Sequence, residues 1–245
     1  MARLAARCVL LAMAAALLTG CSRTVGHTDL LGLNNEPPRQ APACEADADP
    51  EQNVKLDLIR KLMDSGKLYA ALAHLEATRS KSPRSTYLRA EILRQTERTE
   101  QAEPLYRELL GGCLAGKGYH GLGLIAGRDG KIPEALAYLH KAEAELPIDV
   151  KVRNDLGYAL LLDGQFEAAR NEFLTALELD GSDPLSATNM ALLLAVTGKE
   201  REMQAFALHM NMDPETLTQL RAQAEEIKAA IDKQGRGPRS VRHKP

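Results

Sequence analysis

The side chains best suited to catalysis or metal binding in this 245-residue chain are four cysteines and six histidines. A zinc site takes four Cys, His or carboxylate ligands at short, regular spacings, and these residues show no such spacing. No serine lies in a Gly-x-Ser-x-Gly context, and no His-Glu-x-x-His occurs. Glu143 and Glu145 lie near Lys141 in a helix-forming stretch, which is typical of a solvated helix face. The sequence therefore predicts no catalytic residue and no metal site.

A glycine-rich stretch from Gly121 to Gly127 is the one candidate for a nucleotide loop. Its spacing differs from Gly-x-Gly-x-x-Gly, and no strand-like segment precedes it. We therefore expect no nucleotide cofactor and no small-molecule substrate. An enzyme that carried a repeat domain would need a catalytic module of roughly 100 residues, and no unassigned stretch is that long.

The charge distribution argues against a nucleic-acid partner. Residues 21–232 carry 24 basic and 33 acidic groups, a balance of −9. The last thirteen residues carry five cations and no acid. This basic end is either a solvated tail or a contact for anionic lipid or an acidic partner.

The N-terminus has the pattern of an exported lipoprotein. Arg3 and Arg7 precede an apolar run over residues 9–18, which is typical of a secretory signal and about half the length of a membrane span. The sequence Leu18-Thr19-Gly20-Cys21 then resembles the bacterial lipobox. That resemblance implies cleavage before Cys21, acylation of its thiol, and anchoring of the protein in lipid. Ser22 follows, where lipoproteins of the inner membrane carry Asp, so the resemblance implies the periplasmic face of the outer membrane.

A tether and two further cysteines follow the lipobox. Residues 21–52 show no helical period and contain four prolines, so we expect a disordered linker with an end-to-end distance of roughly 30 Å. Lipidation of Cys21 would leave two thiols in the mature chain, Cys44 and Cys113. They form a disulfide only if their Cα atoms come within ~7 Å, which spacing alone does not decide.

A repeat of 34 residues organises the rest of the chain. Gly130, Gly164 and Gly198 lie 34 residues apart, each in a short turn. Other pairs recur at the same interval: Gly123 and Gly157, Ala135 and Ala169, Leu139 and Phe173, Ala142 and Ala176. This pattern is similar to that of tetratricopeptide repeats, in which small residues let two helices cross closely and glycine closes the turn.

The resemblance implies an all-α solenoid of about five helical hairpins over residues 53–213. The copy before Gly130 departs from the pattern because Glu97 stands where the turn glycine is expected. An amphipathic stripe over residues 214–234 predicts a helix that caps the array, and 235–245 would form the disordered basic tail.

Stacked hairpins expose a concave face formed by their first helices, and this face is the predicted partner-binding site. Asn154 and Tyr158, one turn apart on the most regular repeat, are the first choice. The inward positions are Tyr87, Arg94, Lys117, His120, Asn154, Tyr158, Leu161, Thr188 and Leu192.

The lipobox, the tether and the segments 153–170 and 188–198 together resemble the tetratricopeptide lipoproteins of Tad (Flp-type) pilus assembly, the TadD family. The resemblance implies a pilotin-like scaffold that binds the outer-membrane secretin of the pilus and has no enzymatic activity. The alternative on the same architecture is an adaptor for peptidoglycan hydrolases or outer-membrane assembly factors.

Overall fold

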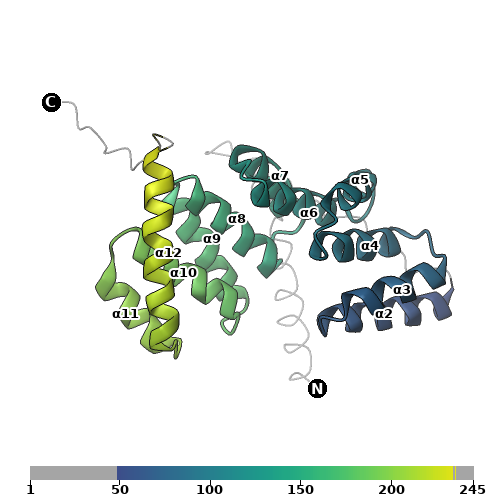
Figure 1. The fold of residues 1–245 in the computed structure, drawn as a ribbon, viewed down its shortest axis with the longest axis horizontal. Helices are drawn as coiled ribbons and strands as arrows, with labels where there is room; N and C mark the ends of the chain where they lie inside the picture. Colours follow the sequence, from purple (N-terminus) through teal and green to yellow (C-terminus); the bar gives the residue numbers. More distant parts are fainter. Residues whose placement is uncertain (1–48, 234, 236–245) are drawn as a thin grey trace, which may run out of the picture. The chain divides into compact units, whose positions relative to one another are not determined.

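The computed structural model describes residues 49–233 and residue 235, and within them it contains eleven α-helices and no β-strand (Figure 1). The helices are α2 Pro50–Asp64, α3 Leu68–Thr78, α4 Pro83–Gln95, α5 Thr99–Leu109, α6 Ala115–Arg128, α7 Ile132–Glu145, α8 Val150–Leu162, α9 Phe166–Leu179, α10 Pro184–Val196, α11 Glu200–His209 and α12 Pro214–Lys233. The first ten pair into five hairpins. The predicted all-α repeat architecture with a C-terminal helix is confirmed.

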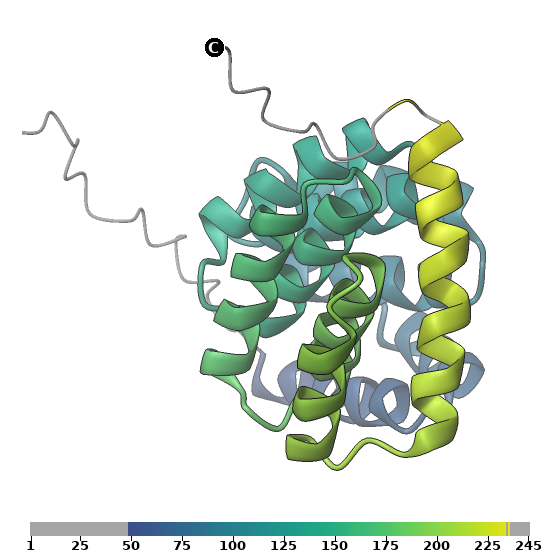
Figure 2. The same ribbon diagram turned by 90° about the vertical axis from the view of Figure 1, so that its left-hand side faces the viewer.

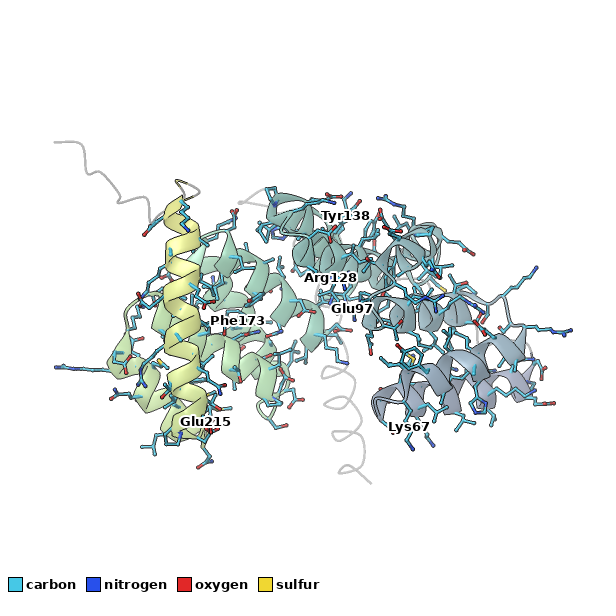
Figure 3. All side chains as sticks on the ribbon, viewed as in Figure 1. Lys67, Glu97, Arg128, Tyr138, Phe173 and Glu215 are labelled. Atoms are coloured by element: carbon cyan, nitrogen blue, oxygen red, sulfur yellow. The ribbon has the colours of Figure 1, made fainter. Side chains whose placement is uncertain are left out.

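Tight turns with a left-handed residue join the two helices of each hairpin. Gly130, Gly164 and Gly198 have φ of +73°, +78° and +72°, a region that glycine enters without a steric penalty. Glu97, in the equivalent turn after α4, adopts φ of +61° (Figure 3). The divergent repeat therefore keeps the left-handed turn, although glutamate disfavours a positive φ.

Side-chain capping marks the start of the first helix in most hairpins. Asp149 Oδ1 accepts from the backbone N–H groups of Lys151 and Val152 at 3.1 and 3.2 Å, and Asp183 Oδ2 accepts from Ser186 N–H at 2.7 Å. These bonds satisfy amide groups that have no partner inside the helix. Asp49 and Ser82 cap α2 and α4 in the same way.

Small residues in the first helices receive large side chains from the second helices. A Cβ atom at Gly123 would lie 2.7 Å from Cγ of Leu139, and one at Gly157 would lie 2.6 Å from the Phe173 ring. Phe173 of α9, which is labelled in Figure 3, and Leu139 are buried as a result. The close crossing predicted from the 34-residue period is therefore present in both central hairpins.

The buried side chains form three clusters along the array. One joins α2, α3 and α4, the second joins α4, α5 and α6, and the third extends from the α6–α7 hairpin to α12. α12 packs mainly against α10 (Figure 2). The third cluster thus includes the C-terminal helix as part of the core.

The predicted signal peptide, Cys21, Cys44 and residues 236–245 of the basic tail lie outside the described residues. α2 begins at Pro50, three residues before the expected start of the array, because Asp49 caps it. Between residues 49 and 233, no helix combines the length and the apolar character that crossing a bilayer requires.

Candidate protein-docking groove

A groove of about 570 Å³ runs along the first helices of the five hairpins. We call it the central groove. Five of the predicted concave-face residues line it, and they come from α4, α6 and α8: Tyr87, Arg94, Lys117, His120 and Asn154. Arg60 of α2 and Leu185 of α10 extend it at the two ends. The stacking of the hairpins therefore brings together predicted residues that are up to 67 positions apart in the sequence.

A buried carboxylate, Glu91, organises the part of the groove that α4 lines. Glu91 accepts hydrogen bonds from Arg94 Nη2 at 3.0 Å and Gln95 Nε2 at 3.2 Å, and a further one from the Tyr106 hydroxyl. Burial alone would raise the pKa of Glu91, but the Arg94 charge and these bonds outweigh it and hold the pKa below its ordinary value. Burial and the Glu91 charge raise the pKa of Tyr106. Glu91 therefore holds the Arg94 guanidinium in place, and Arg94 also lines the groove.

A second ion pair connects two neighbouring first helices across the groove. Lys117 Nζ of α6 lies 2.5 Å from Oδ2 of Asp149, the residue that also caps α8. Burial acts to raise the pKa of Asp149, whereas the hydrogen bond and charge of Lys117 lower it, and the net effect is a lowered pKa. The pair therefore fixes the spacing of α6 and α8 and also occupies the Lys117 ammonium group.

A chain of polar side chains continues from α6 to α10. His120 Nε2 lies 2.7 Å from Asp155 Oδ2, Asn154 Nδ2 donates to Asp155 Oδ1 at 3.1 Å, and Asn189 Nδ2 donates to Asn154 Oδ1 at 2.9 Å. Asn154 is only 1% exposed. Asn154 therefore connects α8 to α10 at the base of the groove, and it exposes little surface to a partner.

Two aliphatic side chains stand open at the rim of this polar groove. Ile148 is 77% exposed and Leu185 is 52% exposed, and both line the groove at the starts of α8 and α10. Exposed aliphatic groups beside a fixed set of charges are typical of a protein-docking surface. Sequence reasoning missed them because it counted positions within helices. The signal available was an aliphatic residue within two positions of each capping aspartate, Asp149 and Asp183.

The other four predicted residues lie outside the central groove. Leu192 of α10 is buried in the third cluster. Tyr158 lines a neighbouring cavity of about 220 Å³, and its hydroxyl accepts from Gln223 Nε2 of α12 at 3.4 Å. Thr188 is partly buried and donates to the Pro184 carbonyl at 2.7 Å. Leu161 is fully buried in the cluster that contains α12, so direct contact with a partner is excluded in this arrangement.

Cys113, in the loop between α5 and α6, is disulfide-bonded. The chain's other cysteines, Cys44 among them, lie outside the described residues, and the Cys44–Cys113 pairing stays a prediction.

The carboxylates that line the groove are engaged within the array. Three of its four carboxylates, Glu91, Asp149 and Asp155, are each engaged by a basic or amide side chain, and the fourth, Asp183, accepts hydrogen bonds from Ser186. Among residues 49–233, no three His, Cys, Asp or Glu side chains gather closely enough to bind a metal ion. Fixed charges and exposed aliphatic groups suit the recognition of a partner protein.

Comparison with known proteins places this geometry in a family. The tetratricopeptide repeat family profile matches residues 56–115 and 120–184. A relative, the TPR repeat-containing protein PA4299 of Pseudomonas aeruginosa, is 34% identical over 228 residues, covering 93% of this chain and 88% of the relative. The chain belongs to the tetratricopeptide repeat family. Its array is a protein–protein interaction scaffold.

Solved structures of other proteins share the fold, among them a TPR protein. TTC0263 of Thermus thermophilus superimposes with a TM-score of 0.54 at 22% identity, over 72% of this chain and 98% of that one. PilF of Pseudomonas aeruginosa has the same TM-score at 20% identity, over 75% of this chain and 89% of that one. At these identities the likeness concerns the fold alone.

Proposed function

We propose that this protein is an outer-membrane lipoprotein that acts as a pilotin-like assembly factor for the secretin of a Tad pilus. The central groove carries the proposal, because it offers a partner two exposed aliphatic side chains above fixed charges. The lipobox-like sequence ending at Cys21 supports a lipid anchor on the periplasmic side of the outer membrane. The resemblance of segments 153–170 and 188–198 to the TadD family supports the secretin as partner.

In this proposal the groove binds a segment of the secretin, and the lipid carries the complex to the membrane. Ile148 and Leu185 contact apolar side chains of the segment. Arg60 and Lys151, which also line the groove, attract acidic side chains or a carboxylate terminus. The energy of binding comes mainly from apolar burial at the rim, since Lys117, His120 and Arg94 are already engaged within the array.

Site-specific photo-cross-linking in cells tests this function. A benzophenone amino acid at Ile148 should capture the secretin, and the same group at Leu208 of α11 should not. Leu208 is the matched control because it is 81% exposed and lies outside the groove. Capture of cell-wall hydrolases or assembly factors from Ile148, with normal secretin multimers in a deletion strain, would replace the pilotin function with the adaptor function.

A further inference from the structure

The packing of α12 breaks the rule that the rest of the array follows. Each of α4, α6, α8 and α10 packs more closely against the second helix of the preceding hairpin than against its first helix. α12 packs against α10, a first helix, and has only marginal contact with α11. Figures 1 and 2 together show α12 lying over one side of the last hairpins and not continuing their stack. It therefore does not occupy the position of a next repeat.

The side that α12 covers is the inner one, where the first helices face a partner. By the repeat count Leu161 and Leu192 hold inward positions, as Tyr87 and Arg94 do in the central groove. Both leucines are buried in the cluster that contains the apolar stripe of α12. All residues from Asn189 to Val196 of α10 are buried, so this helix has no open face left along that stretch. The inner surface is thus open over α4 and α6 and closed over α10.

α12 meets that surface as an amphipathic helical ligand would. Its buried side chains Leu220, Ala224, Ile227 and Ile231 follow a 4-3-4 spacing, which is one face of a helix. Gln223 adds the hydrogen bond to Tyr158 of α8. The opposite face, with Glu225, Glu226 and Ala229, is exposed. The contact is therefore one apolar stripe with a single polar addition from α8.

The edges of this contact are loosely built. A hollow of about 360 Å³ remains between the C-terminal half of α12 and the α8–α9 and α10–α11 turns, lined by Phe166, Val196 and Ile231 among others. The ion pair of Arg221 with Glu200 is close to half exposed, and exposed pairs of this kind contribute little to stability. Only Met210 to Asp213 connect α12 to α11. α12 is thus attached by one apolar stripe, one hydrogen bond, one exposed ion pair and a short hinge.

We propose that α12 is an intramolecular ligand that occupies a second binding site, one that accepts an amphipathic helix of a partner when α12 leaves. The site is the inner surface of α8 and α10, next to the central groove. Its external ligand has aliphatic residues at the spacing of Leu220, Ala224, Ile227 and Ile231. This proposal concerns a different surface from the pilotin function and stands without it.

A labelled peptide with the sequence of residues 214–233 tests the proposal on the full-length protein. In the variant Ile227→Asp/Ile231→Asp, the chain's own α12 undocks, and we expect the peptide to bind at least about tenfold more tightly than to the wild type. The control Ala229→Asp/Ala230→Asp changes the exposed face of the same helix and should bind the peptide as weakly as the wild type does. Fluorescence anisotropy measures both, with circular dichroism to verify the helical array. Equal peptide affinity for all three folded proteins, or none for any, would overturn the proposal.

Native-state hydrogen exchange of the wild-type chain provides a second measurement that needs no variant. If α12 is displaceable, its amides exchange by a local opening that leaves α8 and α10 protected. Exchange of α12 only together with global unfolding of α8 and α10 would make it a permanent part of the core and contradict the proposal.

Discussion

Neighbouring glycines of α6 differ in what surrounds them. A Cβ atom at Gly123 would lie 2.7 Å from Leu139 Cγ, whereas one at Gly127 would meet nothing closer than 3.8 Å. Both glycines have ordinary helical backbone angles, and glycine inside a helix costs about 1 kcal/mol relative to alanine. The same substitution should therefore have opposite effects at two positions one turn apart.

We predict that Gly123→Ala lowers the free energy of unfolding by about 1–3 kcal/mol, because the methyl group forces α6 and α7 apart. Gly127→Ala should raise it by about 0.5–1 kcal/mol. Urea unfolding followed by circular dichroism measures both values. Two effects of the same sign would contradict the close helix crossing described here.

Glu97 holds the left-handed turn after α4 at a steric cost that glycine avoids. Its side chain is exposed, so its removal costs little packing. We predict that Glu97→Gly raises the free energy of unfolding by about 1 kcal/mol. The control is Glu100→Gly at the start of α5, which should be destabilising, and thermal unfolding compares the two. A destabilised Glu97→Gly protein would show that the positive φ is not a source of strain.

The lowered pKa of Glu91 makes stability depend on acid pH. A carboxylate whose pKa is lower in the folded state stabilises the fold above its unfolded pKa of about 4.3, and this contribution is lost as the pH falls through the folded value. We predict that the wild type loses stability below about pH 4.3 and that Glu91→Gln loses less over the same range. Urea midpoints at a series of pH values measure the difference. If the urea midpoints of both proteins fell by the same amount with pH, Glu91 would not be the cause of the acid sensitivity.

At the scale of elements, the sequence predicted the hairpins well and their surroundings poorly. The turn glycines and the small residues of the 34-residue period identified five hairpins, because each position answers a local steric need. The period also assigned Arg94, Lys117 and His120 to one groove. It did not reveal that Asn154 is buried beneath Asp155 and Asn189, because hydrogen bonds between neighbouring repeats depend on side-chain direction.

The C-terminal helix shows the same limit. Its apolar stripe predicts a helix with one buried face, and α12 has that face. A stripe does not specify which surface it covers, and the placement on α10 and not on α11 follows from the whole arrangement of the last hairpins. The repeat count therefore predicts Leu161 on the partner surface, whereas in the structure it is buried in the cluster that contains α12.

The starts of α8 and α10 form the rim of the central groove. We predict that Ile148→Ser/Leu185→Ser weakens binding of the partner by about tenfold or more, since exposed aliphatic anchors often supply about 1–2 kcal/mol each. The fold should persist, because both side chains are exposed. Leu208→Ser is the control, and co-purification with the partner at several salt concentrations provides the measurement. Unchanged binding would place the docking surface elsewhere.

At the scale of the whole molecule, the proposed anchor and the array are separable. We predict that Cys21→Ala moves the protein from the membrane to the soluble periplasmic fraction and leaves its helical circular dichroism unchanged, because acyl chains supply the attachment. Cys8→Ala, a cysteine before the apolar run, should keep the protein at the membrane. Fractionation and immunoblotting measure the distribution, and a Cys21→Ala protein retained in the membrane fraction would contradict lipid anchoring.

The division of the core into three clusters has a consequence for how the protein tolerates damage. In a linear array each repeat is stabilised mainly by its neighbours, so a lesion weakens one stretch and spares the others. The first hairpin can fray at its open end without disturbing the ion pair between α6 and α8 or the side chains around it. The first hairpin can accordingly diverge at little expense to the helices in the middle, whereas a change in α12 acts on a cluster that reaches back to α6.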